Sequence, residues 1–157
     1  MEKIYVTQPD LPSIEELSPY LKEIWEKKIL TNSGDLHNEL EIELAKYLGV
    51  KYVSLFSNGT LALLAALEVL EIRGNVITTP YSFVATSNTL LYKNIKPVFV
   101  DIEKQTLGLD PSKIEECIDS ETTAILPVHV YGMPCNVDAI EDVAKRHNLK
   151  VIYDAAH

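Results

Sequence analysis

The stretch that most clearly indicates the fold is Lys150-Val151-Ile152-Tyr153-Asp154-Ala155-Ala156-His157. Its β-branched and aromatic residues predict a short buried strand that ends at an aspartate. In an open α/β sheet, ligands bind in the crevice beyond the carboxyl ends of the strands. Asp154 is therefore expected either to contact a ligand or to cap a following helix. Because both faces of a parallel sheet need covering helices, we expect this strand to belong to a domain that is incomplete in this chain.

Strands and helices alternate throughout the sequence that precedes this stretch, from residue 50 onward. Short apolar segments predict strands, and the longer segments between them predict helices. The predicted strands are 52–56, 75–79, 97–101, 123–128 and 150–154, and the predicted helices are 60–72, 82–93, 111–119 and 136–147. This alternation indicates right-handed βαβ crossovers. The expected fold class is α/β, with three α/β/α layers around a mostly parallel sheet.

Helices are also predicted before residue 50. Ser13 and Glu16 match a capping box, which marks a helix start. A second helix is predicted from Asp35 to a stop at Gly49, since glycine commonly ends helices. The expected organisation is an N-terminal arm and helix over 1–34 and the main domain over 35–157.

Composition and charge restrict the class of function. The net charge of −9 argues against a general nucleic-acid binder, which needs a basic face. No apolar run approaches the roughly 20 residues of a membrane span, and the amino terminus has no signal-peptide pattern, so a cytoplasmic protein without membrane contact is expected. Cys117 and Cys135 have the spacing of neither a metal site nor a disulfide framework, so no metal is expected.

Four unusual loops follow predicted strands and should meet at one edge of a parallel sheet: 57–60, 80–83, 129–132 and 154–157. The first, Ser57-Asn58-Gly59-Thr60, opens a helix, where backbone amides and the helix dipole can bind a phosphate. A simple helix cap explains the same four residues equally well. Neither a Walker loop nor a dinucleotide fingerprint is present, so one phosphate is the most that this loop suggests.

Single residues in the other loops have two interpretations each. Phe83 is expected in the core from burial statistics, or else stacked on a planar ligand. His129 has no carboxylate or second histidine in its motif and is expected to be structural. A carboxylate at Asp154 would be satisfied by a protonated heteroaromatic nitrogen, and His157 could donate to a phenolate oxygen of the same ligand.

Taken in order, these motifs resemble the DegT/DnrJ/StrS family of pyridoxal-phosphate-dependent sugar aminotransferases, which have the fold-type I architecture. The motifs that carry the resemblance are 29–34, 57–60, 80–86, 96–102, 127–132 and 153–157. The resemblance implies pyridoxal 5'-phosphate as the cofactor. It further implies that Gly59, Thr60 and the amide of Leu61 bind the cofactor phosphate.

The remaining implied contacts concern the cofactor ring. Phe83 would lie on the face of the pyridine, and His157 near its phenolic oxygen. Asp154 would pair with the ring nitrogen and keep it protonated, so that the ring acts as an electron sink. The Schiff-base lysine of the family is expected beyond His157, so that no catalytic residue is expected in this chain.

The resemblance also implies the whole enzyme: a cytoplasmic homodimer that transfers an amino group, with glutamate as donor, to a nucleotide-linked keto-sugar in deoxyamino-sugar or surface-polysaccharide biosynthesis. We expect this chain to be the N-terminal portion of the large domain, without the C-terminal small domain, and to be inactive alone. Two alternatives stay open. One is a family dehydratase with histidine in place of the lysine, and the other is a truncated non-catalytic or regulatory cofactor-binding relic.

Overall fold

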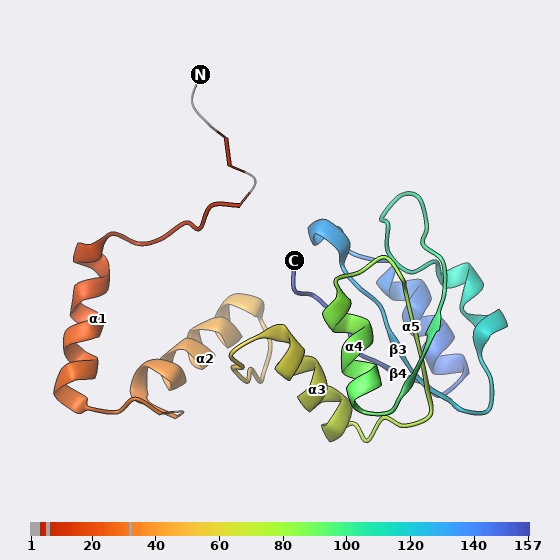
Figure 1. Ribbon diagram of the computed structural model, residues 1–157, viewed down its shortest axis with the longest axis horizontal. Helices are drawn as coiled ribbons and strands as arrows, with labels where there is room; N and C mark the ends of the chain where they lie inside the picture. Colours follow the sequence, from red (N-terminus) through yellow and green to blue (C-terminus); the bar gives the residue numbers. More distant parts are fainter. Residues whose placement is uncertain (1–3, 6, 32) are drawn as a thin grey trace. The chain divides into compact units, whose positions relative to one another are not determined.

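A computed structural model describes residues 4–5, 7–31 and 33–157 (Figure 1). The chain divides into two compact units, Met1–Leu55 and Phe56–His157. The division at residue 34 that the sequence suggested stays a prediction. No helix in the described ranges is long and apolar enough to cross a membrane.

The first unit contains helices α1 (Ile14–Lys27) and α2 (Asp35–Leu48). The predicted capping box is confirmed: the Glu16 N–H donates to the Ser13 hydroxyl at 3.2 Å, and the Ser13 N–H donates to the Glu16 carboxylate at 2.9 Å. The predicted stop of α2 is also confirmed, because Gly49 adopts a left-handed conformation with φ 65°. Neither helix buries any of its described residues, so α1 and α2 contribute no closed core of their own.

The second unit is built on a four-stranded sheet in the order β2-β1-β3-β4. The strands are β1 (Asn75–Thr78), β2 (Lys96–Phe99), β3 (Thr122–Leu126) and β4 (Lys150–Val151). Every pair is parallel, which confirms the expected α/β fold with a parallel sheet. The predicted strand at 52–56 is wrong for this structure. A strand needs a neighbour to satisfy its backbone groups, and no described segment forms a ladder with these residues.

The sheet lies between two helical layers (Figure 1). One face packs against α3 (Gly59–Val69) and α4 (Val84–Tyr92), and the other against α5 (Val137–Arg146) and the turns before β3. The first cluster includes Leu63, Leu67, Val76, Leu90, Leu126 and Ile152, and the second includes Ile77, Leu109, Ile114, Ile125, Ile140 and Val143. Neighbouring strand residues thus point to opposite faces, as the two-residue period of a strand requires. The three-layer prediction is confirmed.

The predicted helix at 111–119 is replaced by two single 3₁₀ turns, η1 (Pro111–Lys113) and η2 (Glu115–Cys117). The carboxylate of Asp110 accepts the Ser112 N–H at 3.0 Å and so starts the first turn. Ile118 is already extended, with φ −80° and ψ 128°, and leads toward β3.

Candidate functional site

A cavity of about 270 Å³ lies at the carboxyl ends of the parallel strands of the second unit. All four loops that the sequence singled out contribute to its lining, as expected from the parallel topology. Five of the six predicted site residues line it: Gly59, Thr60, Phe83, Asp154 and His157. The sixth, Leu61, does not line it. Asp154 and the start of α3 therefore face one common space.

The start of α3 offers an anion-binding end to this cavity. Asn58 caps the helix, because its side-chain oxygen accepts the Leu61 N–H at 3.0 Å. That bond already engages the amide that was predicted to help bind a phosphate. The N–H groups of Gly59 and Thr60 belong to the first turn, where no intrahelical acceptor exists. A Cβ built on Gly59 would meet no atom within 4 Å, so neither packing nor φ requires glycine there.

Asp154 is held in place by its backbone and by its side chain. Its N–H donates to the Pro127 carbonyl at 2.9 Å, and its own carbonyl accepts the His129 N–H at 3.0 Å. The carboxylate accepts the Thr86 hydroxyl at 2.7 Å on Oδ2 and the Ala156 N–H at 3.3 Å on Oδ1. An ionised carboxylate offers about four acceptor positions, so capacity remains for a donor inside the cavity.

Phe83 lies at the mouth of the cavity, immediately before α4, and is 75% exposed. The interpretation of Phe83 as a core residue is therefore wrong. A large apolar ring that is exposed beside a cavity is the arrangement expected for stacking on a planar ligand. That role stays a prediction.

His157 is oriented by the loop that follows β3. The Tyr131 N–H donates to Nδ1 of His157 at 2.9 Å, and the two rings stack with centroids 5.8 Å apart. Since Nδ1 accepts, a neutral His157 carries its proton on Nε2 and can donate it. The Tyr131 hydroxyl in turn lies 3.1 Å from the Tyr81 hydroxyl, and this hydrogen bond raises the pKa of Tyr81. His157 is thus part of an aromatic wall beside the cavity.

His129 has the structural contacts that the sequence suggested. Its Nδ1 accepts the Cys135 N–H at 3.2 Å, and its ring stacks on Tyr153 with centroids 5.3 Å apart. The ring also borders the cavity. In the parts of the chain that the structure describes, no three His, Cys, Asp or Glu side chains gather in a way that could hold a metal ion.

Thr86 and Tyr131 touch predicted site residues, although the sequence analysis did not select them. Thr86 could have been found, because it stands four residues before Leu90 on the inward face of its helix, where a polar residue needs a partner. Tyr131 could not have been found in this way. Its role depends on a left-handed backbone, φ 54°, that aims its N–H at His157.

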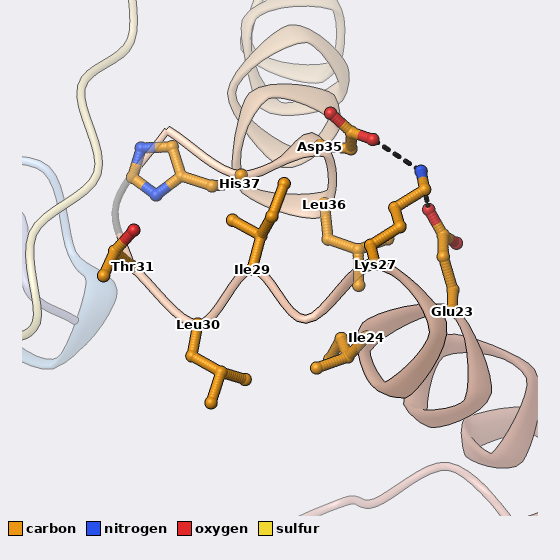
Figure 2. A pocket seen from close by; sticks show the side chains of 10 residues that line it. Glu23, Ile24, Lys27, Ile29, Leu30, Thr31, Asp35, Leu36 and His37 are labelled. Atoms are coloured by element: carbon orange, nitrogen blue, oxygen red, sulfur yellow. Dashed lines mark hydrogen bonds and ion pairs between the residues drawn. The ribbon is translucent and has the colours of Figure 1, made fainter.

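A second cleft, of about 290 Å³, lies within the first unit (Figure 2). Figure 2 shows Lys27 between the carboxylates of Asp35 and Glu23, at 2.5 and 2.7 Å. The hydrogen bond to Asp35, followed by that to Glu23, raises the pKa of Lys27, so this amine stays protonated and is a poor nucleophile. The remaining lining includes the aliphatic side chains of Ile24, Ile29, Leu30 and Leu36, and His37.

Comparison with known proteins gives a consistent picture. A profile of the DegT/DnrJ/EryC1/StrS aminotransferase family matches residues 13–157. The chain is 58% identical over 158 residues to a dTDP-4-amino-4,6-dideoxy-D-glucose transaminase of Shigella dysenteriae, covering 100% of this chain and 43% of that protein. The chain therefore spans less than half the length of this relative.

Solved structures of other proteins have a similar fold over most of this chain. NtdA from Bacillus subtilis with bound cofactor PMP is 39% identical, with a TM-score of 0.87 over 90% of this chain and 33% of NtdA. DesI in the presence of its TDP-sugar product is 32% identical, with a TM-score of 0.91 over 95% of this chain and 38% of DesI. These neighbours are fold-type I enzymes, and their family uses pyridoxal phosphate, which confirms the cofactor and the fold that the resemblance implied.

Proposed function

Because this chain belongs to the DegT/DnrJ/EryC1/StrS aminotransferase family, we propose that it forms the cofactor-binding N-terminal part of a nucleotide-sugar transaminase. The observation that carries the proposal is the shared cavity. An anion-binding helix start and a carboxylate with spare acceptor capacity face the same 270 Å³ space. Residues 1–34 would then be an N-terminal arm and helix, and residues 35–157 part of the large domain.

The residues present fit pyridoxal phosphate. The amides of Gly59 and Thr60 would bind the phosphate, and the empty space beside the Gly59 Cα permits its close approach. Phe83 would cover one face of the ring. When bound, the cofactor supplies an electron sink for moving an amino group and a proton.

Two side chains would control protons at that ring. The Asp154 carboxylate would accept a hydrogen bond from the protonated ring nitrogen, and this charge-assisted bond would stabilise the positive charge of the ring. His157, with its Nε2 proton, would donate to the phenolic oxygen. The Leu61 amide would join the phosphate site only after its bond to Asn58 is broken, so we assign it the weakest of the predicted contacts.

For the substrate we propose a dTDP-linked 4-keto-6-deoxy sugar, with glutamate as the amino donor. The name of the Shigella dysenteriae relative supports this, because exchange of its 4-amino group for a carbonyl gives such a keto-sugar. The working protein would be a cytoplasmic homodimer. None of the described residues that line the cavity is a lysine, and we propose that the lysine that bonds to the cofactor belongs to a part of the protein outside this chain.

Binding of pyridoxamine phosphate tests the cofactor site directly, because this amine needs no covalent lysine. In the full-length protein, Gly59→Ala should weaken binding by about tenfold or more, since the added methyl occupies the approach of the phosphate. Fluorescence titration measures the affinity, and thermal unfolding provides the control for folding. Failure of the parent protein to bind pyridoxamine phosphate would disprove the proposal.

Asp154→Asn tests the ring contact separately. A neutral amide cannot balance a protonated ring nitrogen, so kcat for amino transfer should fall by about 100-fold. The assay follows formation of the 4-amino sugar nucleotide from glutamate and the keto-sugar by mass spectrometry. A parent protein that binds pyridoxamine phosphate but transfers no amino group would instead support the dehydratase or the non-catalytic alternative.

A further inference from the structure

Helix α4 buries two threonine hydroxyls whose hydrogen bonds differ. Thr86 and Thr89 are 1% and 0% exposed. A buried hydroxyl costs free energy unless it is hydrogen-bonded. Thr89 donates to the Thr86 carbonyl at 2.9 Å, within its own helix, which is a common local solution. Thr86 instead donates across 68 residues of sequence to Oδ2 of Asp154, at 2.7 Å.

The direction of the bond between Thr86 and Asp154 follows from the number of protons. An ionised carboxylate can only accept, so the single hydroxyl proton of Thr86 points at Asp154. The Thr86 oxygen can then only accept from Ser82, whose hydroxyl lies 2.5 Å away. Ser82 also lies 3.1 Å from the Phe83 carbonyl, so its own proton has two possible acceptors. Of these hydroxyls, only that of Thr86 reaches the Asp154 carboxylate.

The remaining freedom of Asp154 lies in its side-chain torsions. Its backbone is fixed by the bonds to Pro127 and His129, and an isolated parallel bridge pairs it with Val128. The Ala156 amide holds Oδ1 at 3.3 Å, a long hydrogen bond. The shorter bond from Thr86 therefore decides how the carboxylate plane is turned toward the cavity.

We propose that Thr86 is the positioning residue that aims the Asp154 carboxylate at the ring nitrogen of the cofactor. This inference rests on the proposed function, because it needs a ring in the cavity. Thr86 does not face that cavity and acts only through Asp154. Because Thr86 is fixed within α4, its buried hydroxyl would hold the Asp154 carboxylate in the orientation that keeps the ring nitrogen protonated.

The test compares three variants of the full-length protein. Thr86→Val removes the hydroxyl at nearly constant volume, whereas Thr86→Ser keeps the hydroxyl. Thr89→Val is the matched control, because it removes a buried hydroxyl of the same helix that does not contact Asp154. The readouts are the affinity for pyridoxamine phosphate and the ¹⁵N chemical shift of its ring nitrogen, labelled in the probe, which reports protonation at that atom.

With Thr86→Val, affinity should fall by about tenfold, the effect of one hydrogen bond to a charged group. The ring nitrogen signal should shift toward the unprotonated form. Thr86→Ser should restore both values, and Thr89→Val should match the parent. A parent-like nitrogen signal with Thr86→Val would overturn the inference while leaving the proposed function intact. Equal shifts with Thr86→Val and Thr89→Val would overturn it too, because they would indicate general loosening of α4.

A parent protein that does not bind pyridoxamine phosphate would overturn both the inference and the proposed function. The two failures are distinguishable, because this result appears before any substitution is made.

Discussion

Tyr153, next to the proposed ring contact, buries its hydroxyl in the second unit with no hydrogen-bond partner among the described residues. Its ring stacks on the ring of His129, whereas its hydroxyl makes no hydrogen bond to a described residue. A buried group of this kind costs free energy. Burial also raises the pKa of Tyr153 to about 12, with smaller contributions from Glu141, Cys135 and Asp138.

Tyr153→Phe should therefore raise the free energy of unfolding by about 1 kcal/mol at neutral pH, because it removes the unsatisfied hydroxyl and keeps the ring. The pH dependence has a definite sign. Because the folded pKa of Tyr153, about 12, lies above the unfolded value of about 10, the protein keeps its full stability below pH 10 and loses stability as pH rises from 10 through 12. Chemical denaturation between pH 8 and about pH 11 measures both effects.

The control for this substitution is Tyr92→Phe, because Tyr92 is 73% exposed on α4. It should leave stability nearly unchanged. If Tyr153→Phe lowered the free energy of unfolding, the Tyr153 hydroxyl would have a partner, such as a bound water, and the argument from an unsatisfied group would be incorrect.

At the level of elements, glycine is required by the backbone at Gly74, just before β1, but not at Gly59, the first residue of α3. Gly74 leads into β1 with φ +70°, and a Cβ there would lie 2.3 Å from the Glu121 carbonyl oxygen. The next residue forms the bond that aligns this end of the sheet, because the Asn75 N–H donates to the same carbonyl at 2.8 Å. Gly59 begins α3 in open space. The first glycine is needed by the fold, and the second is not.

Gly74→Ala should destabilise the second unit by about 2 kcal/mol or more, since it combines a left-handed backbone with a clash against the main chain. Thermal unfolding followed by circular dichroism measures this. Gly59→Ala is the matched control and should keep or slightly raise stability, because alanine favours a helix over glycine by up to about 1 kcal/mol. Equal losses from both substitutions would contradict this division between structural and ligand-related glycines.

At the scale of the whole molecule, none of the described lysines lines the cavity, and several are engaged in ion pairs. Lys27 contacts Glu23 and Asp35, and Lys93 contacts Glu68. The hydrogen bonds to Asp35 and Glu23 raise the pKa of Lys27 and so keep its ammonium protonated and unreactive. None of the cavity-lining residues is a lysine.

The 157-residue polypeptide should therefore not bond pyridoxal phosphate at one defined lysine. After incubation with the cofactor and reduction with borohydride, peptide mass spectrometry should find only weak labelling spread over surface lysines. The full-length protein, treated in the same way, is the positive control for the proposed enzyme. Stoichiometric labelling of a single lysine in the 157-residue polypeptide would contradict the proposed arrangement.

The sequence by itself determined the layered architecture and the edge at which the site forms. The strand patterns at 75–79 and 97–101 and the helix pattern at 82–93 between them predict a parallel crossover, and parallel strands bring their following loops to one edge. That is why Gly59 and Asp154, almost a hundred residues apart, could be assigned to one cavity in advance. The same reasoning failed at 52–56, where the pattern of a strand is present but no neighbouring strand satisfies its backbone.

Only the tertiary structure decided which groups orient the site. The bond from Thr86 to Asp154 and the N–H of Tyr131 on His157 join residues whose separation follows no local period. Their formation depends on distances of a few tenths of an ångström between elements, which packing sets and sequence spacing does not express. The exposure of Phe83 was decided in the same way, since a phenylalanine after a strand is buried or exposed according to what packs over it.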